Sequence, residues 1–70
     1  MSWTLASVYM YIGYAIRRPH WGSDKTIRSV RREDHFIVTE FSGDESAGFW
    51  TGWRSDLEAC DWEVVWQSRT

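Results

Sequence analysis

The segment R-R-P-H-W, residues 17–21, places two guanidinium groups, an imidazole and an indole close together in the sequence. A guanidinium makes paired hydrogen bonds to a phosphate, and an indole ring stacks on a nucleobase. Arg17 and Arg18 are neighbours on a predicted strand, so they point to opposite faces and only one of them faces a given pocket. These residue types predict reversible binding of a ligand with a phosphate and a planar ring, with Arg18, His20 and Trp21 as candidate ligand-binding residues. The alternatives are a salt-bridged or solvated arginine, an exposed turn histidine and a tryptophan that caps the sheet edge.

Three further candidates for ligand binding lie in the C-terminal third of the sequence: Trp50, Trp53 and Asp61. Either tryptophan can stand opposite Trp21 in a ligand site. Trp53 is the aromatic residue most expected to be exposed, because it precedes the turn R-S-D. Asp61 has two interpretations: its carboxylate accepts backbone N–H groups of the preceding turn, or it contacts a ribose hydroxyl of a ligand.

No pattern in the sequence predicts catalysis. The serines and cysteine lack the surroundings of an activated nucleophile, and the single glycines form neither a phosphate loop nor a dinucleotide fingerprint. His20, His35 and Cys60 are too scattered for a zinc site. We therefore expect a protein that is not an enzyme, with no catalytic residue, no metal and no cofactor. Cys60 is expected to be a small apolar filler.

The length of 70 residues predicts a single domain, 1–70, with a marginal core. A chain of this size buries only about 60% of the surface that its unfolded form exposes. Small domains usually gain stability from a disulfide, a metal or a partner subunit, and a single cysteine allows no intrachain disulfide. Six tryptophans, three tyrosines and three phenylalanines supply a large aromatic contact area. These features favour a homo-oligomer, a dimer or a tetramer.

Charge and hydropathy exclude two other classes of protein. A net charge of −2 is too balanced for a protein that binds nucleic acid directly through its backbone charge. No apolar run reaches the roughly 18 residues of a membrane span, and no cationic segment precedes residues 3–16 as it does in a signal peptide. We expect a cytosolic protein without a membrane partner.

The hydrophobic pattern predicts an α+β domain in which an N-terminal helix packs on a small antiparallel sheet of four to five strands. Ser2 is the expected N-cap of a helix over 2–12, and Gly13 follows its end. This helix is apolar nearly all round, which suggests that a second subunit covers it. A short helical turn over 55–60, with Ser55 as N-cap and Glu58 at the third position, precedes the last strand. The expected strands are 14–18, 26–31, 35–41, 49–53 and 62–67, with a turn or loop over 42–48 and with Trp62, Val64 and Trp66 facing the core.

Two longer patterns contain most of these residues. The first is W-x-x-A-x-x-x-M-x-x-G-x-x-I-x-R-P-x-W, from Trp3 to Trp21, and the second is W-x-x-x-x-x-D-L-x-A-x-D-W-E-V-V, from Trp50 to Val65. Both resemble the Thoeris anti-defence two family, small phage proteins first known as a domain of unknown function. Members of that family begin with a helix, a glycine and a strand ending in Arg-x-x-Trp, and they close with a D-W-E-V strand. The resemblance covers half of the chain.

The resemblance implies a function as well as a fold. Members look like molecular sponges: homo-oligomers, commonly tetramers, that hold cyclic ADP-ribose-type signals between subunits without cleaving them. Some relatives also take up cyclic nucleotides, and one is described as a CRISPR inhibitor. The chain is therefore expected to be a phage counter-defence protein of the host cytoplasm that sequesters a cyclic nucleotide-derived immune signal. The alternative is an inhibitor that binds a host defence protein, such as a CRISPR effector.

The chain also departs from the family pattern. Only residues 22–49 separate the two motifs, whereas relatives carry a longer segment there, so a pocket closed by that segment would be smaller or more open. Trp53 replaces what is usually a small or polar residue. The outer face of the first helix is apolar where relatives tend to be charged, which suggests a different or more extensive subunit contact; its residues are Leu5, Val8, Tyr11 and Ile12.

Overall fold

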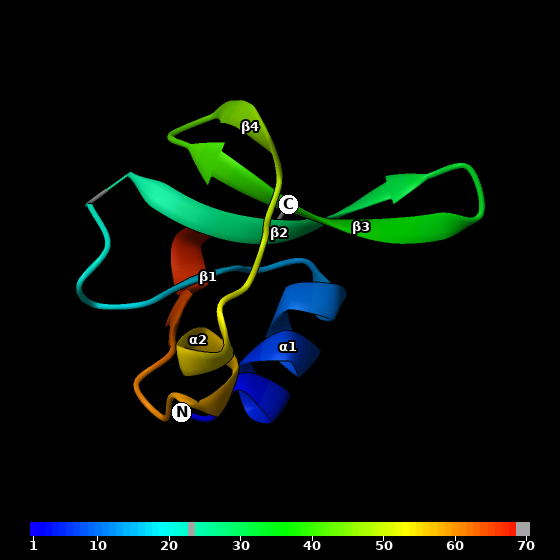
Figure 1. Cartoon of the computed structure of the whole chain (residues 1–70). Helices are drawn as coiled ribbons and strands as arrows, with labels where there is room; N and C mark the ends of the chain where they lie inside the picture. Colours follow the sequence, from blue (N-terminus) through cyan, green and yellow to red (C-terminus); the bar gives the residue numbers. More distant parts are fainter. Residues whose placement is uncertain (23, 69–70) are drawn as a thin grey trace.

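The computed structural model describes residues 1–22 and 24–68, in which one helix packs on a five-stranded sheet (Figure 1). The strands are antiparallel in the order β4-β3-β2-β1-β5, so the predicted α+β class is confirmed. None of the helices in this described part has the length and apolar character to cross a membrane. In chain order the elements are α1 (Trp3–Ile12), β1 (Ala15–Arg17), β2 (Lys25–Arg32), β3 (His35–Ser42), β4 (Glu45–Phe49), α2 (Arg54–Glu58), β5 (Glu63–Val65) and the 3₁₀ helix η1 (Trp66–Ser68).

Helix α1 begins and ends where the sequence predicts. The Ser2 hydroxyl accepts a hydrogen bond from the Leu5 N–H at 3.2 Å, which satisfies one of the free donors of the first turn. Gly13 follows the last helical residue with a φ of 128°, a conformation that residues with a side chain rarely adopt. The helix buries Ala6 and Met10 against the sheet.

The core lies between α1 and the half of the sheet formed by β5, β1 and β2. Ile16 of β1 pairs with Ile27 of β2, and both side chains are fully buried at its centre. The β2–β3 hairpin extends past the helix into solvent (Figure 1). The protein therefore has one compact end and one projecting hairpin. The buried core residues are Ala6, Met10, Ile16, Ile27, Trp62 and Val64.

The register gives β2 and β3 two different faces. Ile27 of β2 and Phe36 of β3 lie on the face that packs on α1, where the Phe36 ring contacts the ring of Tyr11. Arg28 pairs with Thr39, and this pair points to the opposite face, because successive side chains alternate along a strand. We call that face the open face; on β2 and β3 it consists of Thr26, Arg28, Val30, Arg32, His35, Ile37, Thr39 and Phe41.

Strand β4 lies earlier in the chain than predicted. The sequence suggested a turn or loop over 42–48 and a strand over 49–53, but β4 spans Glu45–Phe49 and pairs with β3. The reason is a tight connection through Gly43 and Asp44, in which Gly43 adopts a φ of 61° without steric strain. A short turn therefore joins these strands.

The residues after β4 are irregular because Trp50 turns toward the core. Its ring stacks on that of Trp3, with 5.3 Å between the ring centroids. A Cβ atom at Gly52 would lie 2.5 Å from the Trp50 ring, so the ring needs a glycine there.

Helix α2 spans Arg54–Glu58, and its N-cap is Trp53 rather than the predicted Ser55. The carboxylate of Asp56, at the third helical position, accepts the Trp53 N–H at 3.3 Å, which is the role predicted for Glu58. The Cys60 side chain, beyond the helix, is exposed. The prediction that Cys60 fills an apolar space is therefore wrong, because Cys60 lies in the exposed segment that follows α2.

The last strand is shorter than predicted. Strand β5 ends at Val65, and Ser68 of η1 accepts the hydrogen bond of the Ala15 N–H at 2.7 Å, so a side chain takes the place of the next strand residue. Trp66 consequently leaves the face that it was expected to share with Trp62. It is 55% exposed and packs edge-on against two tyrosine rings, so the prediction that it faces the core is wrong, whereas Trp62 is buried as predicted.

The first prediction concerns the core beneath α1. Met10 is fully buried, so Met10→Ala leaves a cavity and should lower the free energy of unfolding by about 2–5 kcal/mol, a large part of the stability of so small a domain. Urea denaturation followed by tryptophan fluorescence measures this. Thr4→Ala, an exposed position of the same helix, is the control and should change stability by less than about 0.5 kcal/mol. Equal midpoints for the two variants would contradict the core assignment.

Candidate functional site

The two motifs at opposite ends of the sequence meet in the fold. The Met1 amino group donates to the Trp62 carbonyl at 3.0 Å, and the Trp62 N–H donates to the Met1 carbonyl at 3.0 Å. The guanidinium of Arg18, from the first motif, binds the carboxylate of Asp61, from the second. Residues separated by most of the chain therefore form one cluster beside the N-terminus of α1.

Arg18 is the ionic centre of this cluster. Its Nε and Nη2 donate to the two oxygens of Asp61 at 2.7 and 3.3 Å, and its Nη1 donates to Asp56 Oδ1 at 2.6 Å. The side chains of Arg18 and Asp56 are only 14% and 9% exposed, whereas that of Asp61 is 50% exposed. One guanidinium thus holds a buried carboxylate and a half-exposed one.

These contacts shift the pKa values of Arg18 and Asp61 in opposite directions. The hydrogen bond from Arg18 lowers the pKa of Asp61 below its ordinary value, and the same bond raises the pKa of Arg18. Two carboxylates therefore neutralise Arg18, and a ligand phosphate must displace Asp61 to reach it. Asp61 bonds to an arginine side chain rather than to the preceding turn.

Four tryptophans surround the ionic cluster, with Trp62 at their centre. The indole N–H of Trp62 donates to the Asp56 carbonyl at 2.8 Å, and this hydrogen bond fixes the orientation of the ring. Trp21 meets the Trp62 ring edge-on at 5.3 Å and 89°, and Trp50 meets it at 6.0 Å and 82°. The fourth ring, Trp3, lies 5.2 Å from that of Trp62.

The structure brings most of the predicted site residues together, but not all of them. Trp21 is half-buried, and Lys25 Nζ lies 4.6 Å from its ring centroid, so a cation occupies a position where a base would stack. His20 is exposed and touches the Trp21 ring edge-on. Trp50 is half-buried against the core, whereas Trp53 is 75% exposed as predicted and does not join the cluster.

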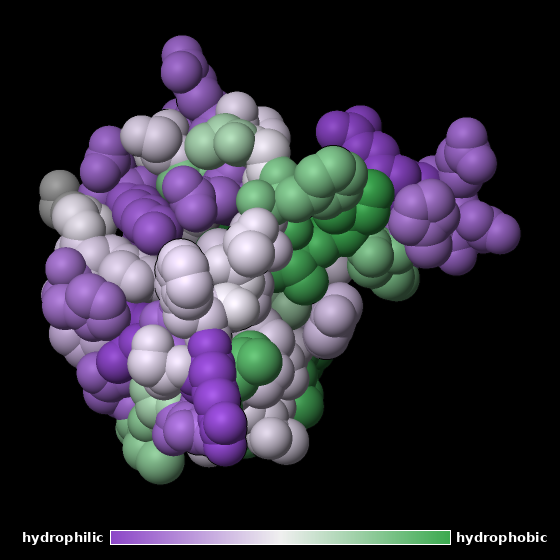
Figure 2. All heavy atoms as spheres, viewed as in Figure 1, coloured by the Kyte–Doolittle hydropathy of each residue, from purple (hydrophilic) through white to green (hydrophobic). Residues whose placement is uncertain are grey.

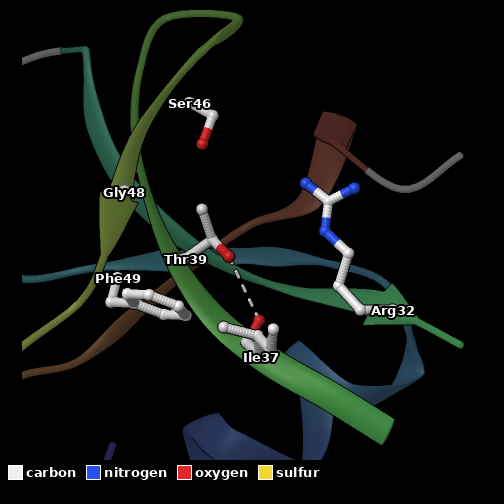
Figure 3. Close-up of a pocket in the computed structure, with 6 residues that line it drawn as sticks. All are labelled: Arg32, Ile37, Thr39, Ser46, Gly48 and Phe49. Carbon is white, nitrogen blue, oxygen red and sulfur yellow. Dashed lines mark hydrogen bonds between the residues drawn. The ribbon is translucent and has the colours of Figure 1, made fainter. Parts of the chain in front are cut away.

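A hollow on the open face was not predicted from the sequence. It has a volume of about 140 Å³, and none of the candidate residues lines it. Figure 3 shows the Arg32 guanidinium and the Phe49 ring on opposite sides of Thr39, with the Ser46 hydroxyl at one end. The alternation R-S-V-R-R of β2 contains the signal for this basic face, but only the pairing with β3 and β4 reveals what faces Arg32. The lining residues are Arg32, Ile37, Thr39, Ser46, Gly48 and Phe49.

No metal cluster is formed by the histidines, cysteine and carboxylates within the described ranges 1–22 and 24–68. Comparison with protein-family models, with curated proteins and with solved structures finds no match to this chain.

The second prediction tests the role of Arg18 in the fold. Arg18→Gln leaves the carboxylate of Asp56 buried without its cation and should lower the free energy of unfolding by about 3 kcal/mol. The control is Arg54→Gln, which removes the same charge from an ion pair with Glu58 in which both side chains are mostly exposed; its effect should stay below about 1 kcal/mol. Urea midpoints of the two variants decide, and similar losses would refute the buried-pair assignment.

The third prediction concerns acid. Because folding lowers the pKa of Asp61, its carboxylate stabilises the fold above the unfolded-state pKa of about 3.9, and this contribution disappears as the pH falls through the folded value. Wild-type protein should therefore lose more stability than Asp61→Asn when the pH is lowered from about 5 to below 3. Urea midpoints across this range measure the difference, and parallel curves would show that Asp61 contributes nothing.

Proposed function

We propose that this chain is a phage counter-defence protein that sequesters a cyclic nucleotide-derived immune signal in the host cytoplasm and leaves the signal intact. The mechanism is mass action: the free signal falls when sites are abundant and when the Kd lies well below the signalling concentration. Binding alone suffices, so the function requires no catalytic residue.

The observation that carries this proposal is the direct contact between the two motifs of the family resemblance. Arg18 of the first motif and Asp61 of the second form a bidentate ion pair, and Trp21 and Trp50 pack on the same Trp62 ring. A chance match at the two ends of a chain carries no requirement that the matched residues touch. Their contact means that the two motifs form one packing unit, and this supports the functional resemblance.

Assembly is part of the same proposal. On the isolated chain the outer face of α1 is about half exposed at four apolar residues, and a second copy supplies the apolar cover that this face lacks. A subunit seam beside Trp21 and His20 can offer the ligand a cleft that one chain does not complete. The exposed fractions are 48% for Leu5, 51% for Val8, 53% for Tyr11 and 50% for Ile12.

A second candidate function is inhibition of a bacterial defence complex through direct protein binding. Its support is the exposure of Trp53 and Phe49, at 75% and 77%, together with Leu57 at 47%. Large exposed aromatic residues are typical anchors of protein interfaces. Under this alternative the host protein, rather than a small molecule, is the partner.

Calorimetry separates the two functions. Cyclic ADP-ribose isomers and cyclic dinucleotides are titrated into the purified protein, and chromatography of the mixture after prolonged incubation tests whether the ligand is intact. We expect saturable binding of at least one ligand. Asp61→Asn should strengthen binding severalfold, since it frees Arg18 from one negative charge, and Arg54→Gln should leave the affinity unchanged. A folded oligomer that binds none of the panel, or a bound ligand that is cleaved, would overturn the proposal.

The fourth prediction concerns assembly. Val8→Glu places a charge in the proposed subunit contact and should shift the protein to monomers, because burying an unpaired carboxylate is costly. Ser55→Glu, which adds the same charge at an exposed position of α2 outside this face, should leave assembly unchanged. Native mass spectrometry and sedimentation velocity report the subunit number. A monomeric wild-type protein would refute the proposed assembly.

A further inference from the structure

The charged residues of strands β2, β3 and β4 are not shared evenly between the two faces of the sheet, which the net charge of the chain does not show. Along β2 the residues that point to this face include Arg28 and Arg32, and no carboxylate occupies an open-face position among residues 25–49, all of which the structure describes. The acidic residues of the paired strands, Glu40 and Glu45, lie on the α1 side, where Glu40 pairs with Lys25 at 3.8 Å. On strands β2, β3 and β4 the open face is therefore a positive surface, on a protein whose net charge is −2.

Arg32 differs from the arginine of the tryptophan cluster because its charge is uncompensated. Arg18 binds two carboxylates and Arg54 binds one, whereas the guanidinium of Arg32 makes no ion pair or hydrogen bond with any described residue. Its guanidinium lies at the side of the hollow (Figure 3). It is therefore available for paired hydrogen bonds to an incoming phosphate.

The rest of the hollow suits a flat apolar group with polar edges. Phe49, on the edge strand, is 77% exposed and forms one wall, and Ile37 contributes apolar surface. The Thr39 hydroxyl donates to the Ile37 carbonyl at 3.2 Å, so it offers an acceptor to a ligand, while the Ser46 hydroxyl can donate. Figure 2 shows apolar side chains gathered beside the strongly polar tip of the β2–β3 hairpin.

The size of the hollow limits the ligand. Sites that enclose a whole drug-sized ligand have about 300–1,000 Å³, so a hollow of about 140 Å³ seats one ring or one phosphate group rather than a whole cofactor. A ligand with a ring on Phe49 and a phosphate at Arg32 must lie across the strands. Arg28, which points to the same face and lies 5.3 Å from the Phe41 ring centroid, extends the positive surface for the remaining phosphate charge.

We propose that the open face is a second binding site, separate from the Arg18 cluster, and that its ligand is a mononucleotide whose base stacks on Phe49 and whose terminal phosphate binds Arg32. Each half of the ligand matches a different chemistry of the hollow, an exposed aromatic ring and an unpaired guanidinium. The site lies on the side of the sheet away from α1, so assembly through the outer face of α1 leaves it accessible.

The test is a titration of ¹⁵N-labelled protein with ADP, with pyrophosphate and with adenosine as the separate halves of the ligand. ADP should shift amide resonances of residues 28–32, 37–41 and 46–49, with a Kd near or below 1 mM. Arg32→Gln should weaken ADP and pyrophosphate binding about tenfold and leave adenosine unchanged, because it removes a charge-assisted pair of hydrogen bonds. Phe49→Leu keeps the apolar bulk but removes the stacking ring, so it should weaken ADP and adenosine about tenfold and leave pyrophosphate unchanged.

The matched control is Arg31→Gln, one residue away on the same strand. Arg31 pairs with Phe36 and points to the α1 side, so its loss removes the same charge from the opposite face and should change the Kd for ADP less than about twofold. The proposal is overturned if Arg31→Gln and Arg32→Gln weaken ADP equally, if about 5 mM ADP shifts no open-face amide, or if the shifts concentrate around Arg18 and Trp21. Loss of the signal-binding function proposed above would leave these results unchanged, because none of the variants touches the tryptophan cluster.

Discussion

The fold depends on the burial of one indole ring, that of Trp62. Distant parts of the chain contact it: Met1 pairs with its backbone, and the rings of Trp3, Trp21 and Trp50 pack on its ring. With no disulfide and only seven buried apolar residues in its described part, a domain this small must replace the missing core volume with aromatic area. The indole N–H donates a hydrogen bond to the Asp56 carbonyl, so the ring is buried without leaving a polar group unpaired.

The same requirement for satisfied polar groups explains the ionic cluster. Asp56 caps α2 through the Trp53 N–H, lies almost buried beside Trp62 and therefore needs a cation, which Arg18 supplies. This structural duty competes with ligand binding, since an arginine held by two carboxylates is a weak phosphate receptor. Any anion that binds here must exchange with Asp61, the more exposed of the two partners. Affinity at this site is thus coupled to the stability of the subunit.

The sheet distributes its two faces between two tasks. One face holds α1 and the core, and the other projects arginines and phenylalanines toward solvent on the strands that extend beyond the helix. Because Arg31 and Arg32 are consecutive, a shift of one residue in register would exchange their faces and place the wrong guanidinium at the hollow. The positive surface is consequently a property of the register set by the tight β3–β4 and β2–β3 turns, and not of composition.

Strong local signals in the amino-acid sequence were enough to predict α1 between Ser2 and Gly13, the hairpin strands β2 and β3, and the α+β class. These depend on caps, glycine conformations and hydrophobic period, which act between residues close in the chain. The partner of Arg18 and the exposure of Trp66 became visible only in the folded chain, because each depends on groups more than forty residues away. The N-cap role of Trp53 was missed for a local reason, since two residues of one short segment, Asp56 and Glu58, could each supply the acidic side chain of a capping box. The predicted position of β4 was wrong because strand pairing with β3 outweighed the local strand propensity of F-W-T-G-W.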